Sequence, residues 1–231
     1  MLQYLTMDSS YEHEGNTLGT NNREQLPPRP ELEALPEAVR AYVEWLETER
    51  RSLQEQARSL AMEAYVDSLT GLWKADIFDE FLQQEWKRLQ RADFGAEQPA
   101  AFSLLYIDVD DFKQINDTWG HAIGDRYLER IGQLLAENKR DNDLACRLSG
   151  DEFALALPDT DSDGARTVAE KLQVARQQPL QSGGHDIAIS FSIGIASHRF
   201  GDSPEEVRQR ADAALYQAKS VENKGIIAQE K

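Results

Sequence analysis

Apolar residues recur every seven positions near the beginning of the chain. A second row, four residues further on, holds Val43, Ala57 and Ala64 and is interrupted by Arg50. A narrow apolar stripe of this period predicts one long helix over residues 37–66 and is typical of a coiled coil. Because about 30 helical residues span roughly 45 Å, pairing with a second chain explains the stripe better than packing on a small domain. The repeating residues are Leu32, Val39, Leu46, Leu53 and Leu60.

Beyond residue 66 the pattern changes to short apolar runs that alternate with segments of helical period. This order predicts an α/β or α+β sandwich in which helices flank a central sheet. We expect helices over residues 75–91, 122–138, 162–177 and 204–221, and strands over residues 101–109, 144–148, 152–157, 187–196 and 225–228.

The pattern divides the chain into three parts. Residues 1–30 are polar and rich in Gly, Asn and Pro, which predicts a flexible tail. Residues 31–66 form the predicted dimerisation helix, and residues 67–231 form the predicted globular domain.

Composition excludes several classes of function. The formal net charge is −16, from 41 acidic and 25 basic residues, which argues against a nucleic-acid-binding surface and against docking on an acidic membrane. No apolar run is long enough to span a membrane, and the first ten residues lack the basic and apolar segments of a signal peptide. The lone Cys146 lies in an apolar run, which is typical of a buried core residue, and fits a reducing cytoplasm.

Two acidic clusters stand at the ends of predicted strands. Asp108, Asp110 and Asp111 end the first apolar run, and Asp151 and Glu152 lie in the tight turn between two later strands. Carboxylates that converge in this way suit Mg²⁺ and the transfer of phosphoryl groups. Each cluster alone is equally consistent with an ordinary strand end or hairpin turn that meets water.

A third polar segment runs from Asn116 to Asp125. We expect a polar loop followed by a helix start, with both residues facing one pocket. An aspartate that accepts hydrogen bonds from guanine would reject adenine, which lacks the N1 donor. The alternative for Asp125 is an acid favoured at a helix N-terminus by the helix dipole.

Taken together, these segments resemble the GGDEF family of nucleotidyl cyclases. The resemblance covers residues 67 to about 228. It begins with Asp67-Ser68-Leu69-Thr70-Gly71-Leu72 and continues with Asp108-Val109-Asp110, Phe112-Lys113, Asn116-Asp117, Gly120-His121 and Gly124-Asp125. Its last segments are Ser149-Gly150-Asp151-Glu152-Phe153, Ser192 to Ala196 and Ala211 to Lys219.

The resemblance implies a diguanylate cyclase that condenses two GTP molecules into cyclic di-GMP. It also implies an α+β fold with a five-stranded, mostly antiparallel sheet, related to adenylate cyclases and polymerase palm domains. The implied site contains two Mg²⁺ or Mn²⁺ ions. The metal ligands would be Asp108, the Val109 carbonyl, Asp151 and Glu152, with Asp151 and Glu152 also catalytic; the substrate contacts would be Asn116, Asp125, Lys113, Lys219, Phe112 and Gly150.

The same resemblance extends to a product-binding inhibitory site and includes three departures. Arg140 and Asp143 form an R-x-x-D segment shortly before the acidic turn, where the family binds cyclic di-GMP. Ser149 replaces the first glycine of the signature. Asn223 replaces a phosphate-binding arginine, and Trp73-Lys74-Ala75 replaces the usual Asn-Arg.

These features leave three functional hypotheses. The leading hypothesis is a homodimeric cyclase, because two facing domains are needed to form the two links of cyclic di-GMP, and the helix brings them together. The departures keep open a catalytically weak or inactive domain that senses cyclic di-GMP or GTP. A scaffold held by the coiled coil is the third hypothesis, and the complete set of acidic residues argues against it.

Overall fold

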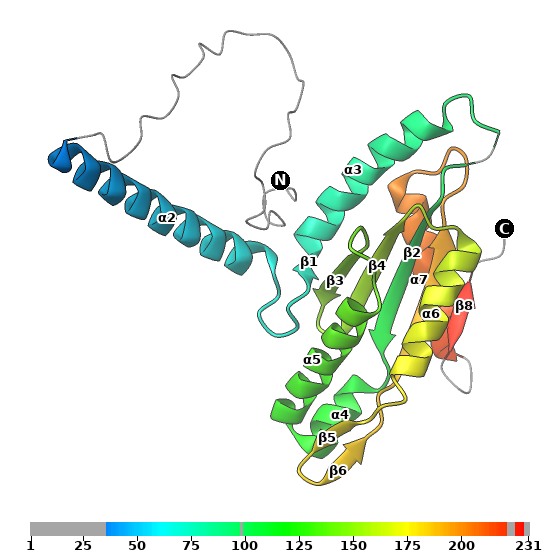
Figure 1. Cartoon of the computed structure of the whole chain (residues 1–231). Helices are drawn as coiled ribbons and strands as arrows, with labels where there is room; N and C mark the ends of the chain where they lie inside the picture. Colours follow the sequence, from blue (N-terminus) through cyan, green and yellow to red (C-terminus); the bar gives the residue numbers. More distant parts are fainter. Residues whose placement is uncertain (1–35, 98, 221–224, 229–231) are drawn as a thin grey trace. The chain divides into compact units, whose positions relative to one another are not determined.

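A computed structural model describes residues 36–97, 99–220 and 225–228 of the chain (Figure 1). The chain divides between Ala64 and Tyr65 into two units, which we describe separately. In the first unit, helix α2 (Glu37–Tyr65) begins and ends within one residue of the predicted positions. Its repeating residues Val39, Leu46, Leu53 and Leu60 are all exposed among the described residues. The predicted tail and residues 31–35 lie outside the described part.

The second unit is built around one mixed sheet. Its strand order is β1-β3-β4-β2-β7-β8, in which the outer pairs β1–β3 and β7–β8 are parallel and the three inner pairs are antiparallel. The predicted α+β class with a mostly antiparallel sheet is confirmed, and the two-residue strand β1 adds a sixth member. The strands are β1 (Trp73–Lys74), β2 (Phe102–Val109), β3 (Leu144–Ser149), β4 (Glu152–Pro158), β7 (Phe191–Ser197) and β8 (Ile226–Ala228).

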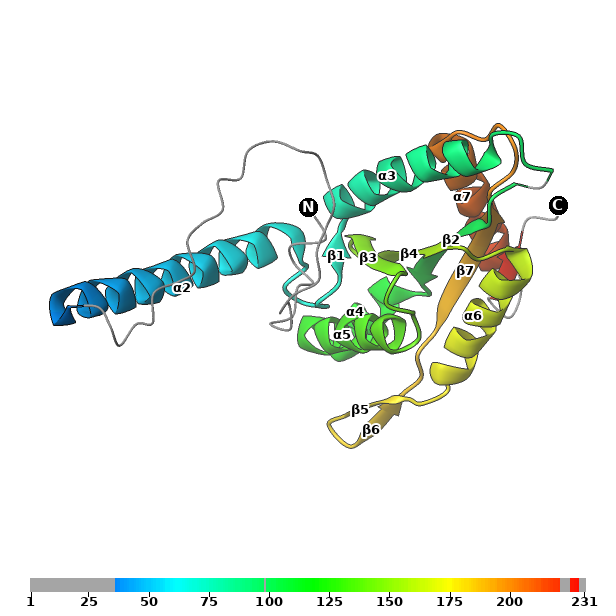
Figure 2. The same cartoon turned by 45° about the horizontal axis from the view of Figure 1, so that its top comes forward.

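Helices cover both faces of this sheet. Helices α3 and α7 lie on one face, and α4, α5 and α6 lie on the other (Figure 2). No helix in the described part of the chain is both long and apolar enough to cross a lipid bilayer. The helices are α3 (Ala75–Asp93), α4 (Phe112–Trp119), α5 (His121–Glu137), α6 (Ser162–Ala175) and α7 (Pro204–Ser220).

The central strand β2 is apolar on both faces because helices bury both of them. Leu105, Ile107 and Val109 belong to the core that α5 and α6 cover. On the opposite face Tyr106 packs against Phe78 of α3, with ring centroids 6.2 Å apart. Since side chains alternate along a strand, Asp108 projects to the face of Tyr106, which α7 also covers.

Besides strand β1, the structure differs from the predicted elements in three places. Residues 112–119 form helix α4, which includes Asn116, where the predicted polar loop begins. Strands β5 (Leu180–Ser182) and β6 (His185–Ile187) form a separate two-stranded hairpin that was not predicted. As a result, the strand expected to begin at residue 187 begins at Phe191. The prediction that Cys146 is a core residue is confirmed, and burial raises the pKa of its thiol.

Candidate functional site

Strand pairing brings the two acidic clusters together at one end of the sheet. Asp108 of β2 lies directly opposite Glu152 of β4 in the antiparallel register. The backbone N–H of Val109 donates a hydrogen bond of 3.2 Å to the carbonyl oxygen of Asp151. Residues directly opposite each other project from the same face with Cβ atoms about 5 Å apart. The predicted convergence of Asp108, Asp151 and Glu152 is therefore what the backbone of these strands produces.

Asp108 lies in a charged but mostly buried setting. The Lys219 Nζ atom lies 2.7 Å from its Oδ2 atom, and the side chain of Asp108 is only 10% exposed. Burial has the largest effect and raises the pKa of Asp108. The Lys219 ammonium opposes that shift, while the negative charges of Asp151 and Glu152 reinforce it. The lysine therefore offsets the cost of gathering carboxylates at this position.

The turn between β3 and β4 depends on one glycine. Gly150 has a φ of +37°, a conformation that favours glycine, whereas Ser149 is not among the described residues with positive φ. The Ser149 hydroxyl donates a hydrogen bond of 2.6 Å to Glu152 Oε2. Serine in the first position of the signature therefore fits the backbone of the turn without strain.

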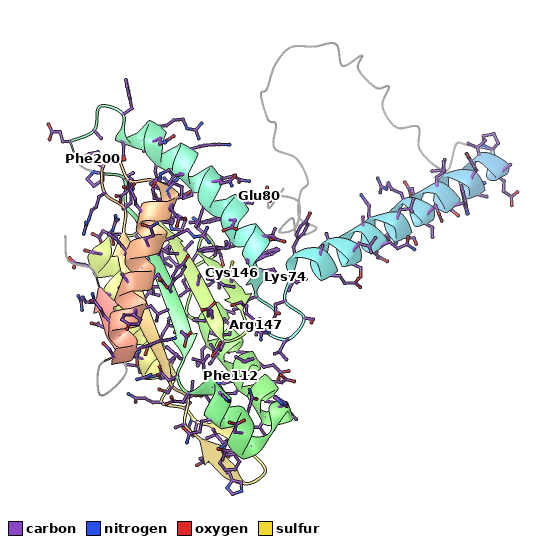
Figure 3. The ribbon with its side chains drawn as sticks, turned by 180° about the vertical axis from the view of Figure 1, so that it is seen from behind. Lys74, Glu80, Phe112, Cys146, Arg147 and Phe200 are labelled. Carbon is purple, nitrogen blue, oxygen red and sulfur yellow. The ribbon has the colours of Figure 1, made fainter. Side chains whose placement is uncertain are left out.

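Arg147 ties this turn to the beginning of the second unit. Its Nε and Nη2 atoms donate to the Gly150 carbonyl at 2.9 and 2.7 Å, and its Nη1 atom lies 3.1 Å from Asp67 Oδ1. Arg147 pairs in register with Lys74 of the adjacent strand β1 (Figure 3). Burial alone would raise the pKa of Asp67, but hydrogen bonds from Thr70 and Arg147 outweigh it and lower that pKa. No local pattern of the sequence indicates a role for Arg147, because its partner Asp67 is 80 residues away.

The Asp110 side chain has a structural role. Its carboxylate is buried and accepts hydrogen bonds from Ser190 Oγ at 2.6 Å and Ser192 Oγ at 2.8 Å. The Asp110 N–H also donates to the Ser190 carbonyl at 3.1 Å. These contacts fasten the end of β2 to the beginning of β7, directly after Asp108 and Val109. The network was not predicted, since serine hydroxyls give no signal at such sequence separation.

The predicted base-recognition residues lie on two consecutive helices. Asn116 is on α4, and Asp125 is the fifth residue of α5. The Asn116 side chain lies over Gly124, where an added Cβ atom would be 2.0 Å from Asn116 Oδ1. Only glycine leaves room for Asn116 at position 124, directly before Asp125. The structure therefore places Asn116 against the turn of α5 that carries Asp125, and a pocket shared by the two side chains stays a prediction.

Phe112 and Lys113 begin helix α4 immediately after β2. Phe112 is partly buried and packs against the hydrophobic core, while Lys113 is exposed. Phe112 therefore anchors α4, and Lys113 remains accessible to a ligand at this end of the sheet.

The R-x-x-D segment forms a tight turn before β3. The Asp143 carboxylate is buried and accepts a 2.7 Å hydrogen bond from the backbone N–H of Arg140. The Asp143 N–H donates back to the Arg140 carbonyl at 3.1 Å. Arg140 itself is exposed. Asp143 therefore already stabilises the turn, and only Arg140 is fully available to a ligand.

The donor set at the acidic end of the sheet fits a hard cation. The available ligands are carboxylate and carbonyl oxygens, which Mg²⁺ prefers. Within the described ranges, no three acidic, histidine or cysteine side chains are gathered closely enough to hold an ion alone. Mg²⁺ is commonly bound through one or two carboxylates together with substrate phosphates. Asp108, Asp151 and Glu152 fit such a site, which the substrate completes.

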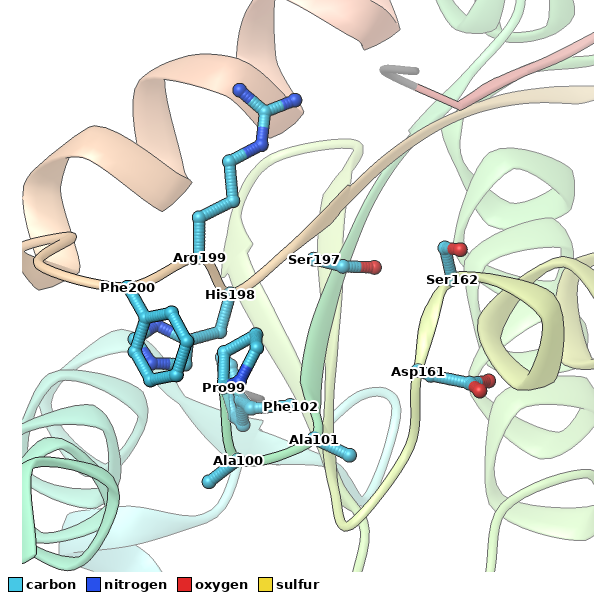
Figure 4. A pocket seen from close by; sticks show the side chains of 10 residues that line it. All are labelled: Pro99, Ala100, Ala101, Phe102, Asp161, Ser162, Ser197, His198, Arg199 and Phe200. Carbon is cyan, nitrogen blue, oxygen red and sulfur yellow. The ribbon is translucent and has the colours of Figure 1, made fainter. Parts of the chain in front are cut away.

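A separate cavity of about 570 Å³ lies away from these residues. It is lined by the beginning of β2, the end of β7, and Asp161 and Ser162 at the start of α6 (Figure 4). Phe102 lines it and Asp108 does not, although both belong to β2. Cavity size therefore does not identify the acidic site, which lies at the ends of the inner strands β2 and β4.

Comparison with known proteins agrees with this geometry. Residues 64–224 match the sequence profile of a family described as "Diguanylate cyclase, GGDEF domain". The chain is 38% identical over 192 residues to the diguanylate cyclase TpbB of Pseudomonas aeruginosa, which covers 82% of this chain. It is 37% identical over 169 residues, or 73% of its length, to MucR of the same organism, a bifunctional diguanylate cyclase and cyclic di-GMP phosphodiesterase. The matched regions span 43% of TpbB and 24% of MucR.

Two solved structures are similar over most of the chain. The diguanylate cyclase SiaD of P. aeruginosa, in complex with its activator SiaC, has a TM-score of 0.67 at 32% identity, covering 83% of this chain and 73% of that one. The coiled coil and GGDEF domain of DgcB from Caulobacter crescentus, in complex with c-di-GMP, has a TM-score of 0.70 at 26% identity, covering 84% and 100%. The family profile matches well over half of the residues, and its signature residues occupy the acidic end of the sheet. The chain therefore belongs to the GGDEF family.

Proposed function

We propose that this chain is a diguanylate cyclase, which joins two GTP molecules into cyclic di-GMP and releases two pyrophosphates. The observation that carries the proposal is the pairing of Asp108 with Glu152, next to the backbone bond between Val109 and Asp151. These contacts gather Asp108 of β2, Glu152 of β4 and Asp151 of the turn before β4 at one end of the sheet. Such an arrangement suits phosphoryl transfer better than a purely structural role does.

In the proposed reaction each acidic residue has a distinct task. Asp151 accepts the proton of the attacking 3′-hydroxyl, while Asp108, Glu152 and the Val109 carbonyl hold divalent cations, two Mg²⁺ or Mn²⁺ per site. When bound, these cations neutralise the phosphates and polarise the α-phosphate for attack. Each 3′-oxygen forms a bond to the α-phosphorus of the other GTP, and the bond to pyrophosphate breaks.

The substrate is held by residues of the helices around the sheet end. Asn116 and Asp125 bind the guanine edge, a role supported by the way the Asn116 side chain lies over Gly124. Lys113 and Lys219 neutralise the phosphates, which offsets the negative charge of the protein. Phe112 supports this surface from the core, and Gly150 lets the phosphates approach the backbone of the turn.

We propose a homodimer formed through residues 31–66, with residues 67–231 as the catalytic domain. Cyclic di-GMP contains two equivalent phosphodiester links, so two GTP-loaded domains must face each other. The exposed stripe of α2 supports pairing, since Val39, Leu46, Leu53 and Leu60 are 42%, 44%, 56% and 66% exposed in the single chain. Pairing would bring two catalytic domains to a high effective concentration.

We further propose that the product inhibits the enzyme through Arg140 and Asp143. The exposed Arg140 guanidinium can form two parallel hydrogen bonds to a phosphate or a guanine edge. Asp143 already holds the turn, so its contribution is to orient Arg140 and to offer its second oxygen.

The test is turnover of GTP by the purified full chain with Mg²⁺, with the product identified by mass spectrometry. We expect cyclic di-GMP, and Asp151→Asn should lower its rate by roughly 10²–10⁴-fold, the usual contribution of a general base. Asp186→Asn, at an exposed position on the β5–β6 hairpin, is the matched control and should leave the rate unchanged. A folded protein that makes no product with Mg²⁺ or Mn²⁺ contradicts the proposal.

The second candidate is a sensor that binds cyclic di-GMP or GTP without turnover. The replacements at Ser149 and Asn223 support it, although Asn223 lies outside the described residues. Calorimetry that detects cyclic di-GMP binding to a chain with no turnover would select this function.

A further inference from the structure

Ser149 is a departure from the family signature that has a specific contact in this chain. It ends β3 and pairs across the turn with Glu152, the first residue of β4. The register of β3 against β4 shifts between Arg147 and Ser149. The Ser149 hydroxyl donates to Glu152 Oε2 at 2.6 Å. A glycine at this position has no side chain with which to make this bond.

The hydrogen bond from Ser149 restrains the side chain of Glu152, which would otherwise change rotamer freely. Glu152 is exposed, and an exposed glutamate samples many rotamers in water. Its carboxylate has about four lone-pair sites, so the serine hydroxyl occupies one and leaves the others for further partners. Asp108 lies directly opposite Glu152 on the neighbouring strand. The serine therefore restrains Glu152 without blocking its approach to a cation that Asp108 also faces.

We infer that Ser149 is a positioning residue that orients Glu152 for divalent-cation binding in this chain. The inference rests on the proposed role of Glu152 in the cyclase site. Groups that hydrogen-bond a metal ligand typically change cation affinity by roughly 10–100-fold when they are removed. Because both side chains are exposed, we expect the lower end of this range, about tenfold.

The primary test is a titration of the full chain with Mn²⁺ in the presence of a non-hydrolysable GTP analogue. Electron paramagnetic resonance measures the concentration of free Mn²⁺. Ser149→Ala should weaken Mn²⁺ binding about tenfold, and Ser149→Gly should behave similarly. Ser149→Thr keeps the hydroxyl and should retain the original affinity. In turnover assays Ser149→Ala should need about ten times more Mg²⁺ for half-maximal rate and recover its rate at saturating Mg²⁺.

A double-substitution cycle separates this mechanism from a general effect on the turn. If Ser149 acts through Glu152, adding Ser149→Ala to the Glu152→Gln variant should have no further effect on Mn²⁺ affinity. Circular dichroism and thermal unfolding establish that each variant is folded. Equal Mn²⁺ affinities of the original chain and Ser149→Ala would overturn the inference, and so would the absence of Mn²⁺ binding by the original chain. Because the titration needs no turnover, it decides the role of Ser149 even if no cyclic di-GMP is made.

Discussion

Replacement of Arg147 by methionine should both destabilise the second unit and misplace its acidic turn. The arginine makes two hydrogen bonds to the Gly150 carbonyl and contacts both Asp67 oxygens, at 3.1 and 3.2 Å. Methionine keeps much of the apolar stem and removes every one of these donors. Gly150 is the residue before Asp151, so the substitution releases the turn that carries the proposed catalytic base.

The expected loss of stability is about 2 kcal/mol. A hydrogen bond to a charged group contributes about 1.5–3 kcal/mol, but water can replace the donor at the exposed Gly150 carbonyl. Asp67 also keeps its hydrogen bonds from Thr70 N at 2.8 Å and Oγ1 at 2.7 Å. For a unit of this size, 2 kcal/mol corresponds to a fall in Tm of roughly 4–8 °C.

The expected loss of turnover is larger than the loss of stability alone would cause. A displacement of about 1 Å at a reacting group can cost roughly 100-fold in rate, so we expect GTP turnover to fall about 10- to 100-fold at a temperature where the variant is folded. Arg147→Lys keeps the charge but not the forked geometry, and should be intermediate.

The assays are thermal unfolding by circular dichroism and steady-state formation of cyclic di-GMP. Arg88→Met is the control, because Arg88 pairs with Glu85 and Asp159 and has no contact with the acidic turn. It should lower Tm slightly and leave turnover unchanged. If Arg147→Met lowers Tm as expected but turns over GTP at the original rate, then Arg147 does not position the turn and the reasoning is wrong.

Three further predictions follow from other parts of the structure. Gly124→Ala should raise the KM for GTP about tenfold, because the added Cβ atom displaces Asn116. The better helix propensity of alanine, about 1 kcal/mol, maintains the fold. An unchanged KM would contradict the role of Asn116. Leu46→Asp with Leu53→Asp should weaken dimerisation in analytical ultracentrifugation and lower turnover at low protein concentration, whereas Thr48→Asp, off the apolar stripe, should do neither. Burial alone would raise the pKa of Asp202, but hydrogen bonds from Arg210 and the Arg199 backbone outweigh it and lower that pKa. This contact therefore stabilises the fold above about pH 4 and is lost as the pH falls through the lowered pKa, so the difference in Tm between the original chain and Asp202→Asn should shrink between pH 6 and pH 3.

The local patterns of the sequence determined most of the secondary structure. The seven-residue stripe predicted α2 to within a residue at each end, because the period of a helix depends only on its own backbone. The apolar run before Asp108 predicted the central strand, since a strand buried on both faces has a nearly continuous apolar sequence. The signature residues identified the family because their order and spacing are properties of the chain itself.

Helix α4 and the hairpin β5–β6 escaped prediction for different reasons. Helix α4 has a polar sequence, and its stability comes from the packing of Phe112 and Ile115 on the core, which no local pattern reveals. The hairpin β5–β6 had a readable signal in Gly183 and Gly184, whose φ values are +58° and +82°, but the neighbouring isoleucines suggested one longer strand.

Only the tertiary structure decided which polar residues meet. Asp67 and Arg147 are 80 residues apart, and so are Asp110 and Ser190, yet both pairs join around the acidic end of the sheet. Their contacts depend on the order of strands in the sheet, and several orders fit the same alternation of helices and strands. The sequence therefore determined the kind of site and its acidic residues. The fold determined the partners that orient these residues, because a hydrogen bond between distant segments exists only after the strands that carry them are adjacent.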